Sequence, residues 1–236
     1  MTNSLPQREG GINLLPVLHV DESAGTESAY LRSAEIAPEI GASGIFLVNE
    51  KNKRSTKYLD GVIRLLQDEF PDFNFGVSYP AYKGALETVH QVRWKLLLEE
   101  YDIEPMLWIE EPLGGTSGDM QLDELELLLK SQELSTAKVP MLFGSVALDG
   151  SGVVPSFLDV AVVGKVGSKQ PVSANVASLK LVSGVPVAVA GISSRNELFL
   201  RDNADFVLLT GGLESDEPGL ISRQRLVEFE ATAEKI

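Results

Sequence analysis

Two neighbouring segments near the end of the chain decide the fold: VPVAVAGISS (residues 185–194) and ADFVLLTGG (residues 204–212). Each is a continuous apolar run that ends in glycine and hydroxyl residues. Such runs are typical of parallel strands that are buried on both faces of a sheet. The segment between them, residues 193–200, has a helical pattern of apolar positions. The two segments therefore predict two successive strand–helix units.

The same alternation of short apolar runs and amphipathic stretches extends over the 236 residues. The expected strands are residues 12–20, 44–49, 73–78, 106–110, 141–147, 160–163, 185–190 and 206–209. The expected helices are residues 27–40, 56–70, 86–100, 122–131, 176–182, 193–200 and 221–235. Eight units of about 30 residues each predict a closed (β/α)₈ TIM barrel with parallel strands rather than an open sheet. We expect one domain over residues 1–236, with residues 1–11 as a flexible N-terminal segment.

The charge and composition exclude several classes of partner and site. The net charge is −14 with no visible basic face, which argues against nucleic acid as a partner. The chain contains no cysteine, so disulfides, zinc–thiolate sites and a Cys nucleophile are excluded. The first residues lack the apolar core of a signal peptide, and no apolar run is long enough to cross a membrane. These features predict a cytoplasmic protein without membrane insertion, and a homo-oligomer is compatible with them.

The candidate catalytic residues follow from the predicted fold, because the active site of such a barrel lies at the carboxyl ends of the strands. Polar side chains that stand at expected strand ends are His19, Glu50, Glu110 and Lys165. A histidine changes its charge near neutral pH, and it is suited to proton transfer there. The two glutamates suit the same role. A structural role for His19 at the barrel rim is the alternative.

The ends of the last two expected strands carry the strongest signal for a ligand. A glycine at position 191 lets the backbone approach a bound group closely, and Ser193 starts a helix whose N–H groups point at an anion. The loops after strands seven and eight are the recurrent phosphate site of TIM barrels. The predicted phosphate-binding residues are Gly191, Ile192, Ser193, Thr210, Gly211 and Gly212. The alternative is that these glycines only turn the chain.

The sequence predicts no organic cofactor and no dedicated metal site. A divalent cation such as Mg²⁺ remains an alternative, because hard oxygen ligands are available in Glu50, Glu110, Glu111 and Asp149. Lys165 follows an apolar run, and a desolvated lysine there would be a Schiff-base nucleophile with Glu50 as its proton shuttle. That pairing resembles class I aldolases of the keto-deoxy-phosphogluconate type.

Three stretches resemble the BtpA/SgcQ-type TIM barrels. They are LPVLHV (residues 15–20), IFLVNE (residues 45–50) and the region 159–214 with its Val-Pro-Val strand, Gly-Ile-Ser turn and glycine-rich end. The resemblance implies the barrel fold. For function it implies either a biogenesis factor or an enzyme linked to sugar or nucleoside metabolism.

The sequence thus leaves three interpretations of function open. The first is an enzyme acting on a phosphorylated small metabolite, sugar-like or nucleotide-like, whose phosphate is held after strands seven and eight. The second is a non-catalytic metabolite-binding or assembly factor of the BtpA type. The third is a Schiff-base aldolase that uses Lys165.

Overall fold

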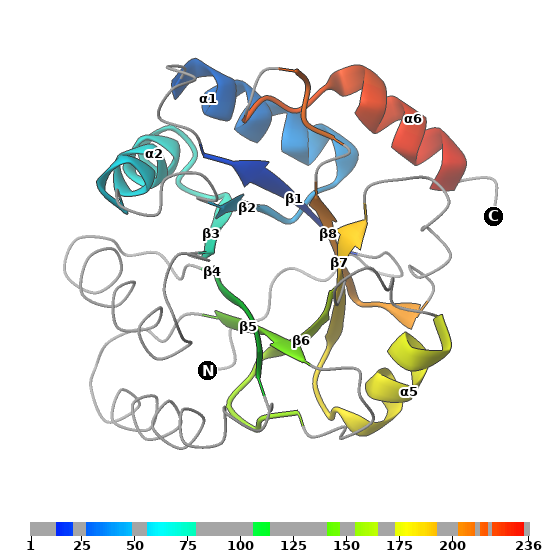
Figure 1. The fold of residues 1–236 in the computed structure, drawn as a ribbon. Coiled ribbons are helices and arrows are strands. Elements are labelled where there is room, and N and C mark those ends of the chain that lie inside the picture. The colour runs from blue at the N-terminus through cyan, green and yellow to red at the C-terminus, as the bar shows by residue number, and fades with distance from the viewer. Residues whose placement is uncertain are drawn as a thin grey trace.

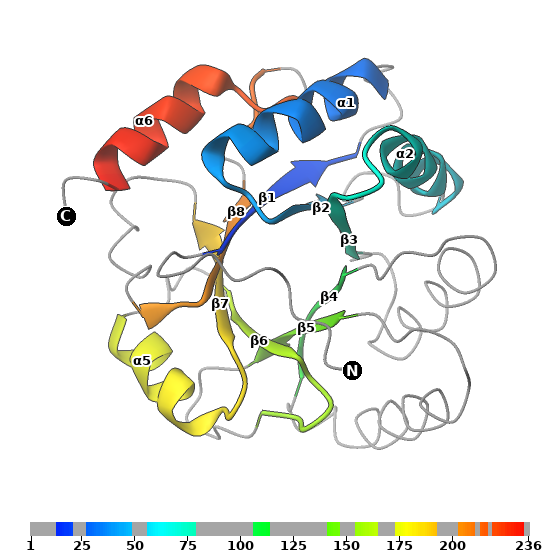
Figure 2. The same ribbon diagram turned by 180° about the vertical axis from the view of Figure 1, so that it is seen from behind.

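The structure, a computed structural model, forms a closed barrel of eight parallel strands in chain order, with β8 beside β1. It describes residues 13–20, 27–48, 56–78, 106–113, 141–146, 154–164, 173–192, 203–210, 213–216 and 219–233. Figure 1 and Figure 2 look along the barrel from its two ends, with the strands as an inner ring and the helices outside them. The (β/α)₈ barrel predicted from the sequence is confirmed.

The strands occupy the segments expected of them, within a few residues. Their bounds are β1 (Asn13–His19), β2 (Gly44–Val48), β3 (Asn74–Ser78), β4 (Met106–Leu113), β5 (Met141–Val146), β6 (Val160–Val163), β7 (Val187–Ile192) and β8 (Phe206–Thr210). The largest shift at a strand start is in β7, which was expected to begin at Val185. Pro186 has no N–H for a strand ladder. The next N–H, of Val187, donates to the Asp205 carboxylate at 3.0 Å.

The described helices are α1 (Glu27–Ile36), η2 (Ala37–Ile40), α2 (Thr56–Glu69), α5 (Ser173–Val182) and α6 (Arg223–Ala233). The expected helix 27–40 is thus an α-helix that continues as a 3₁₀ turn, because Pro38 cannot make the next α-helical hydrogen bond. Gly41 ends it with a φ of 70°, a left-handed conformation that glycine adopts readily at the end of a helix. The expected helices 86–100, 122–131 and 193–200 lie outside the described residues.

The core consists of two apolar clusters, one inside the barrel and one between the strands and the helices. The interior cluster contains only strand residues, taken from alternate positions: Leu15, Val17, Phe46, Val48, Met106, Trp108, Phe143, Val160, Val162, Ala188, Ala190, Phe206 and Leu208. Its aromatic rings meet edge to face, with Phe143 centred 5.1 Å from Phe46 and 5.6 Å from Phe206. The second cluster joins the other strand faces to helix residues such as Tyr30 and Leu59. The interior is therefore a packed core rather than a pore.

Carboxylates tie neighbouring strands together at the amino ends of the barrel. The Leu142 N–H at the start of β5 donates to Asp159 Oδ2 at 2.8 Å, just before β6. Partial desolvation raises the pKa of the Asp159 carboxyl, and this hydrogen bond opposes the rise. Asp205, just before β8, accepts from Val187 N and from Lys180 Nζ. This face of the barrel thus serves stability, and it leaves the opposite face for a site.

None of the helices in the described ranges has both the length and the apolar composition that crossing a bilayer requires.

Candidate active site

His19 is the last residue of β1, at the carboxyl end of the barrel. Leu15 and Val17 belong to the interior cluster, so the alternation of the strand directs position 19 to the same face. The His19 side chain keeps 26% of its surface exposed, whereas Leu15 is fully buried and Val17 nearly so. His19 therefore stands where the apolar interior of the barrel meets its mouth.

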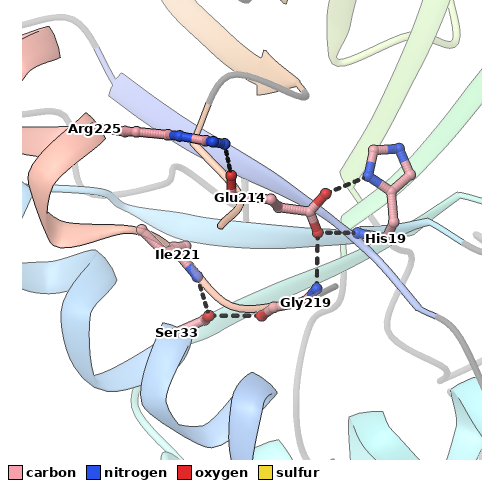
Figure 3. A network of polar contacts seen from close by, with 6 residues as sticks. All are labelled: His19, Ser33, Glu214, Gly219, Ile221 and Arg225. Carbon is pink, nitrogen blue, oxygen red and sulfur yellow. Dashed lines mark hydrogen bonds and ion pairs between the residues drawn. The ribbon is translucent and has the colours of Figure 1, made fainter. Parts of the chain in front are cut away.

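The carboxylate of Glu214 holds both the backbone and the ring of His19. Glu214 Oε1 accepts the His19 backbone N–H at 2.8 Å, and Glu214 Oε2 lies 2.6 Å from His19 Nδ1. A third group, the Gly219 N–H, donates to Oε1 at 3.1 Å. Figure 3 shows the carboxylate placed between His19 and Gly219. Only 12% of the Glu214 side chain is exposed, so solvent screens this pair less than it would screen a surface pair.

Glu214 is positioned by a short antiparallel turn that follows β8, here named the rim hairpin (residues 213–216 and 219–222). Glu214 is bridged to Ile221, and two backbone hydrogen bonds flank the bridge, Ser215 N–H to Leu220 O and Ser222 N–H to Leu213 O, both at 2.8 Å. Arg225 of α6 donates to the Glu214 carbonyl oxygen from the other side (Figure 3). The backbone of Glu214 is therefore held on both flanks.

The rim hairpin is fastened to α1 through Ser33. The buried Ser33 hydroxyl donates to the Gly219 carbonyl at 2.7 Å and accepts the Ile221 N–H at 2.8 Å. Gly219 has a φ of 79°, and a Cβ there would lie 2.1 Å from the Tyr30 ring. Only glycine fits this position, because both the backbone conformation and the contact with α1 exclude a side chain. The Glu214 carboxylate is thus fixed by packing that begins on a different helix.

At the predicted phosphate corner the structure describes Gly191, which has a φ of 83° inside β7. The register of β7 on β8 shifts between Ala190 and Ile192, so Gly191 lies at an irregularity of the ladder. A glycine at such a point marks a bulge or a close backbone approach to another group. β8 lies between β7 and β1, so one strand separates the strand of Gly191 from the strand of His19.

The remaining predicted site residues are only partly described. Glu110 stands in β4 and Thr210 at the end of β8, where Thr210 pairs in register with Val17. The register of β4 on β5 shifts between Ile109 and Leu113, so strand alternation does not tell which way Glu110 points. Their side chains and that of Ile192 are outside the described part of the structure. The residues wholly outside it are Glu50, Lys165, Ser193, Gly211 and Gly212, with Asp149 of the cation alternative.

The residue that the sequence reasoning missed is Glu214. Its signal was present, because an acidic residue follows the glycine-rich end of the last strand, and a closed barrel brings that end beside the first strand. Its distance of 195 positions from His19 hid the pairing. Within the described residues, no group of three His, Asp or Glu side chains is arranged to hold a metal ion. The cation alternative rests on side chains that are not described, and it stays a prediction.

Comparison with known proteins supports the architecture. The tryptophan synthase alpha chain of Legionella pneumophila matches with a TM-score of 0.61 at 12% identity, over 97% of this chain and 94% of that one. A tryptophan synthase structure from Mycobacterium tuberculosis matches with a TM-score of 0.60 at 14% identity, over 94% of this chain and 91% of that one. A truncated 3-deoxy-D-arabino-heptulosonate 7-phosphate synthase from Thermotoga maritima matches with a TM-score of 0.54 at 10% identity, over 95% of this chain and 87% of that one.

These likenesses concern the fold, because identities of this size carry no information on substrate. No protein-family model and no curated protein sequence matches the chain. The resemblance to the BtpA/SgcQ-type barrels therefore stays a prediction at the level of the family. At the level of the fold the comparisons agree with the strand order: this chain is a TIM barrel.

Proposed function

We propose that this chain is an enzyme that acts on a phosphorylated small metabolite, sugar-like or nucleotide-like, and that His19 transfers a proton in the reaction. The observation that carries the proposal is the contact of 2.6 Å between His19 Nδ1 and the largely buried Glu214 carboxylate at the mouth of the barrel. A carboxylate on one ring nitrogen orients a histidine and stabilises its protonated form. This arrangement is what a general base or acid needs.

The phosphate part of the proposal rests on Gly191 and on strand order. The positive φ of Gly191 at the irregular end of β7 turns the chain where a ligand would meet the backbone. Backbone N–H groups and a helix N-terminus bind phosphate without basic side chains, which suits a chain of net charge −14. A phosphate held there would place the rest of a small metabolite over β8 and β1, toward His19.

The test is turnover of a panel of phosphorylated sugars, nucleotides and keto acids by the intact protein. We expect at least one member to be converted, and His19→Asn to lower kcat/KM by about 10²- to 10⁴-fold, the usual contribution of a general acid or base. The matched control is Glu39→Gln, which removes an exposed carboxylate of η2 paired with the exposed Arg223, and which should leave turnover unchanged.

Two outcomes would overturn the proposal. Conversion by His19→Asn at the wild-type rate would remove His19 from the chemistry. Phosphate binding without conversion of any panel member would favour the non-catalytic binding or assembly factor. Borohydride trapping with the keto acids tests the remaining alternative, the Schiff-base aldolase. An adduct mass on Lys165 would establish Schiff-base chemistry.

A further inference from the structure

We propose that Glu214 is a positioning residue that keeps the ring proton of His19 on Nδ1, so that Nε2 is the nitrogen that exchanges a proton with the substrate. The inference rests on the proposed function for its consequence in catalysis. The position of the proton is a property of the protein alone, however, and it is measured without a substrate.

Two backbone hydrogen bonds hold the Glu214 carboxylate in one orientation. Glu214 Oε1 accepts two backbone N–H groups, from His19 at 2.8 Å and from Gly219 at 3.1 Å. Rotating the carboxylate away would leave both donors without this acceptor at a largely buried position, which is costly. Glu214 Oε2 is therefore held against His19 Nδ1 (Figure 3).

The orientation of the Glu214 carboxylate decides which nitrogen of the neutral His19 ring carries the proton. An ionised carboxylate only accepts hydrogen bonds, so the nitrogen that faces Oε2 at 2.6 Å must be the donor. The short distance fits a charge-assisted hydrogen bond. A neutral ring with its proton on Nδ1 carries its lone pair on Nε2.

With its proton on Nδ1, the His19 ring exchanges protons with the substrate through Nε2. A proton leaves an acidic group of the substrate for Nε2, the ring becomes an imidazolium, and Glu214 balances its charge. The same proton then passes from Nε2 to the product, and the ring returns to its starting state. The bond from Nδ1 to Glu214 is kept throughout, so the ring does not have to turn.

The test uses long-range ¹H–¹⁵N correlation spectra of the histidine rings, which distinguish the two neutral tautomers from the imidazolium. The chain has only two histidines, so a His90→Gln variant assigns both rings. At a pH where the ring is neutral, we expect the His19 proton on Nδ1. A neutral wild-type ring with its proton on Nε2 would overturn the proposal, even if no Glu214 variant folds.

Glu214→Gln should invert the tautomer. Its amide oxygen takes the place of Oε1, because the two backbone donors of His19 and Gly219 require an acceptor there. The amide nitrogen then faces Nδ1 and donates to it, which moves the ring proton to Nε2. The control Glu39→Gln should leave the spectrum unchanged. A proton that stays on Nδ1 in Glu214→Gln would contradict the positioning role.

The two proposals fail separately. If the tautomer inverts but no panel compound is converted by the wild type, the positioning role stands and the enzymatic function fails. If a compound is converted, we expect Glu214→Gln to lower kcat by at least tenfold with KM changed less than threefold. If turnover depends on His19 but the His19 tautomer is unchanged in Glu214→Gln, the proposed enzymatic function stands. The positioning role of Glu214 is then wrong.

Discussion

Two single residues, Glu214 and Gly219, set the geometry of the rim. Glu214 satisfies three groups at once, namely the His19 N–H, the Gly219 N–H and the His19 ring. Gly219 combines a left-handed backbone with a contact against Tyr30 that leaves no room for a methyl group. The rim therefore depends on a carboxylate of the right length and on the absence of a side chain.

At the residue scale we expect Gly219→Ala to lower the free energy of unfolding by about 2–5 kcal/mol. The left-handed conformation costs a residue with a Cβ about 1–2 kcal/mol, and overpacking against the Tyr30 ring adds about 1–3 kcal/mol. Urea unfolding monitored by fluorescence measures the change.

The matched control is Gly61→Ala in α2, where a Cβ would meet nothing within 4 Å. Alanine is the better helix former, so the free energy of unfolding of this variant should rise by about 0.5–1 kcal/mol. Equal changes in the two variants would show that the Tyr30 contact has no energetic role.

The rim hairpin and α1 are joined into one structural unit beside the candidate site. Ser33 is the link, since its hydroxyl serves both the Gly219 carbonyl and the Ile221 N–H. At the surface, Arg223 of α6 forms an ion pair with Glu39 of η2 at 2.7 Å, and both side chains are more than half exposed, so water screens this pair. Figure 1 and Figure 2 both show α1 and α6 side by side over β1 and β8. The first and last described helices thus frame the same pair of strands.

At the element scale we expect Ser33→Ala to destabilise the protein by about 1–3 kcal/mol. The substitution leaves a buried carbonyl and a buried N–H without their partner, and an unsatisfied buried group costs about that much. Ser28→Ala, on the exposed side of the same helix, should stay within about 0.5 kcal/mol of the wild type. Coincident urea unfolding curves for the two variants would contradict the role of Ser33.

At the scale of the whole molecule, closure of the barrel brings the residues of the candidate site together. The strands were predictable from the sequence because each is a continuous apolar run, and their order follows from the alternation with helices. His19 and Gly191 could be proposed as candidates from the sequence because they lie at or next to the carboxyl ends of apolar runs. The pairing of His19 with Glu214 was not, since it depends on β8 returning to β1 and on a turn whose shape is set by contacts with α1.

If His19 and the phosphate corner belong to one site, bound phosphate must perturb the His19 ring, and a titration with inorganic phosphate tests this most directly. The ¹⁵N resonances of the His19 ring should shift saturably with phosphate in the wild type. They should shift equally in Gly184→Ala, a positive-φ glycine in the turn between α5 and β7, and not in Gly191→Ala. Both substitutions carry the same backbone strain of about 1–2 kcal/mol. Phosphate binding that leaves the His19 ring unchanged would contradict the account.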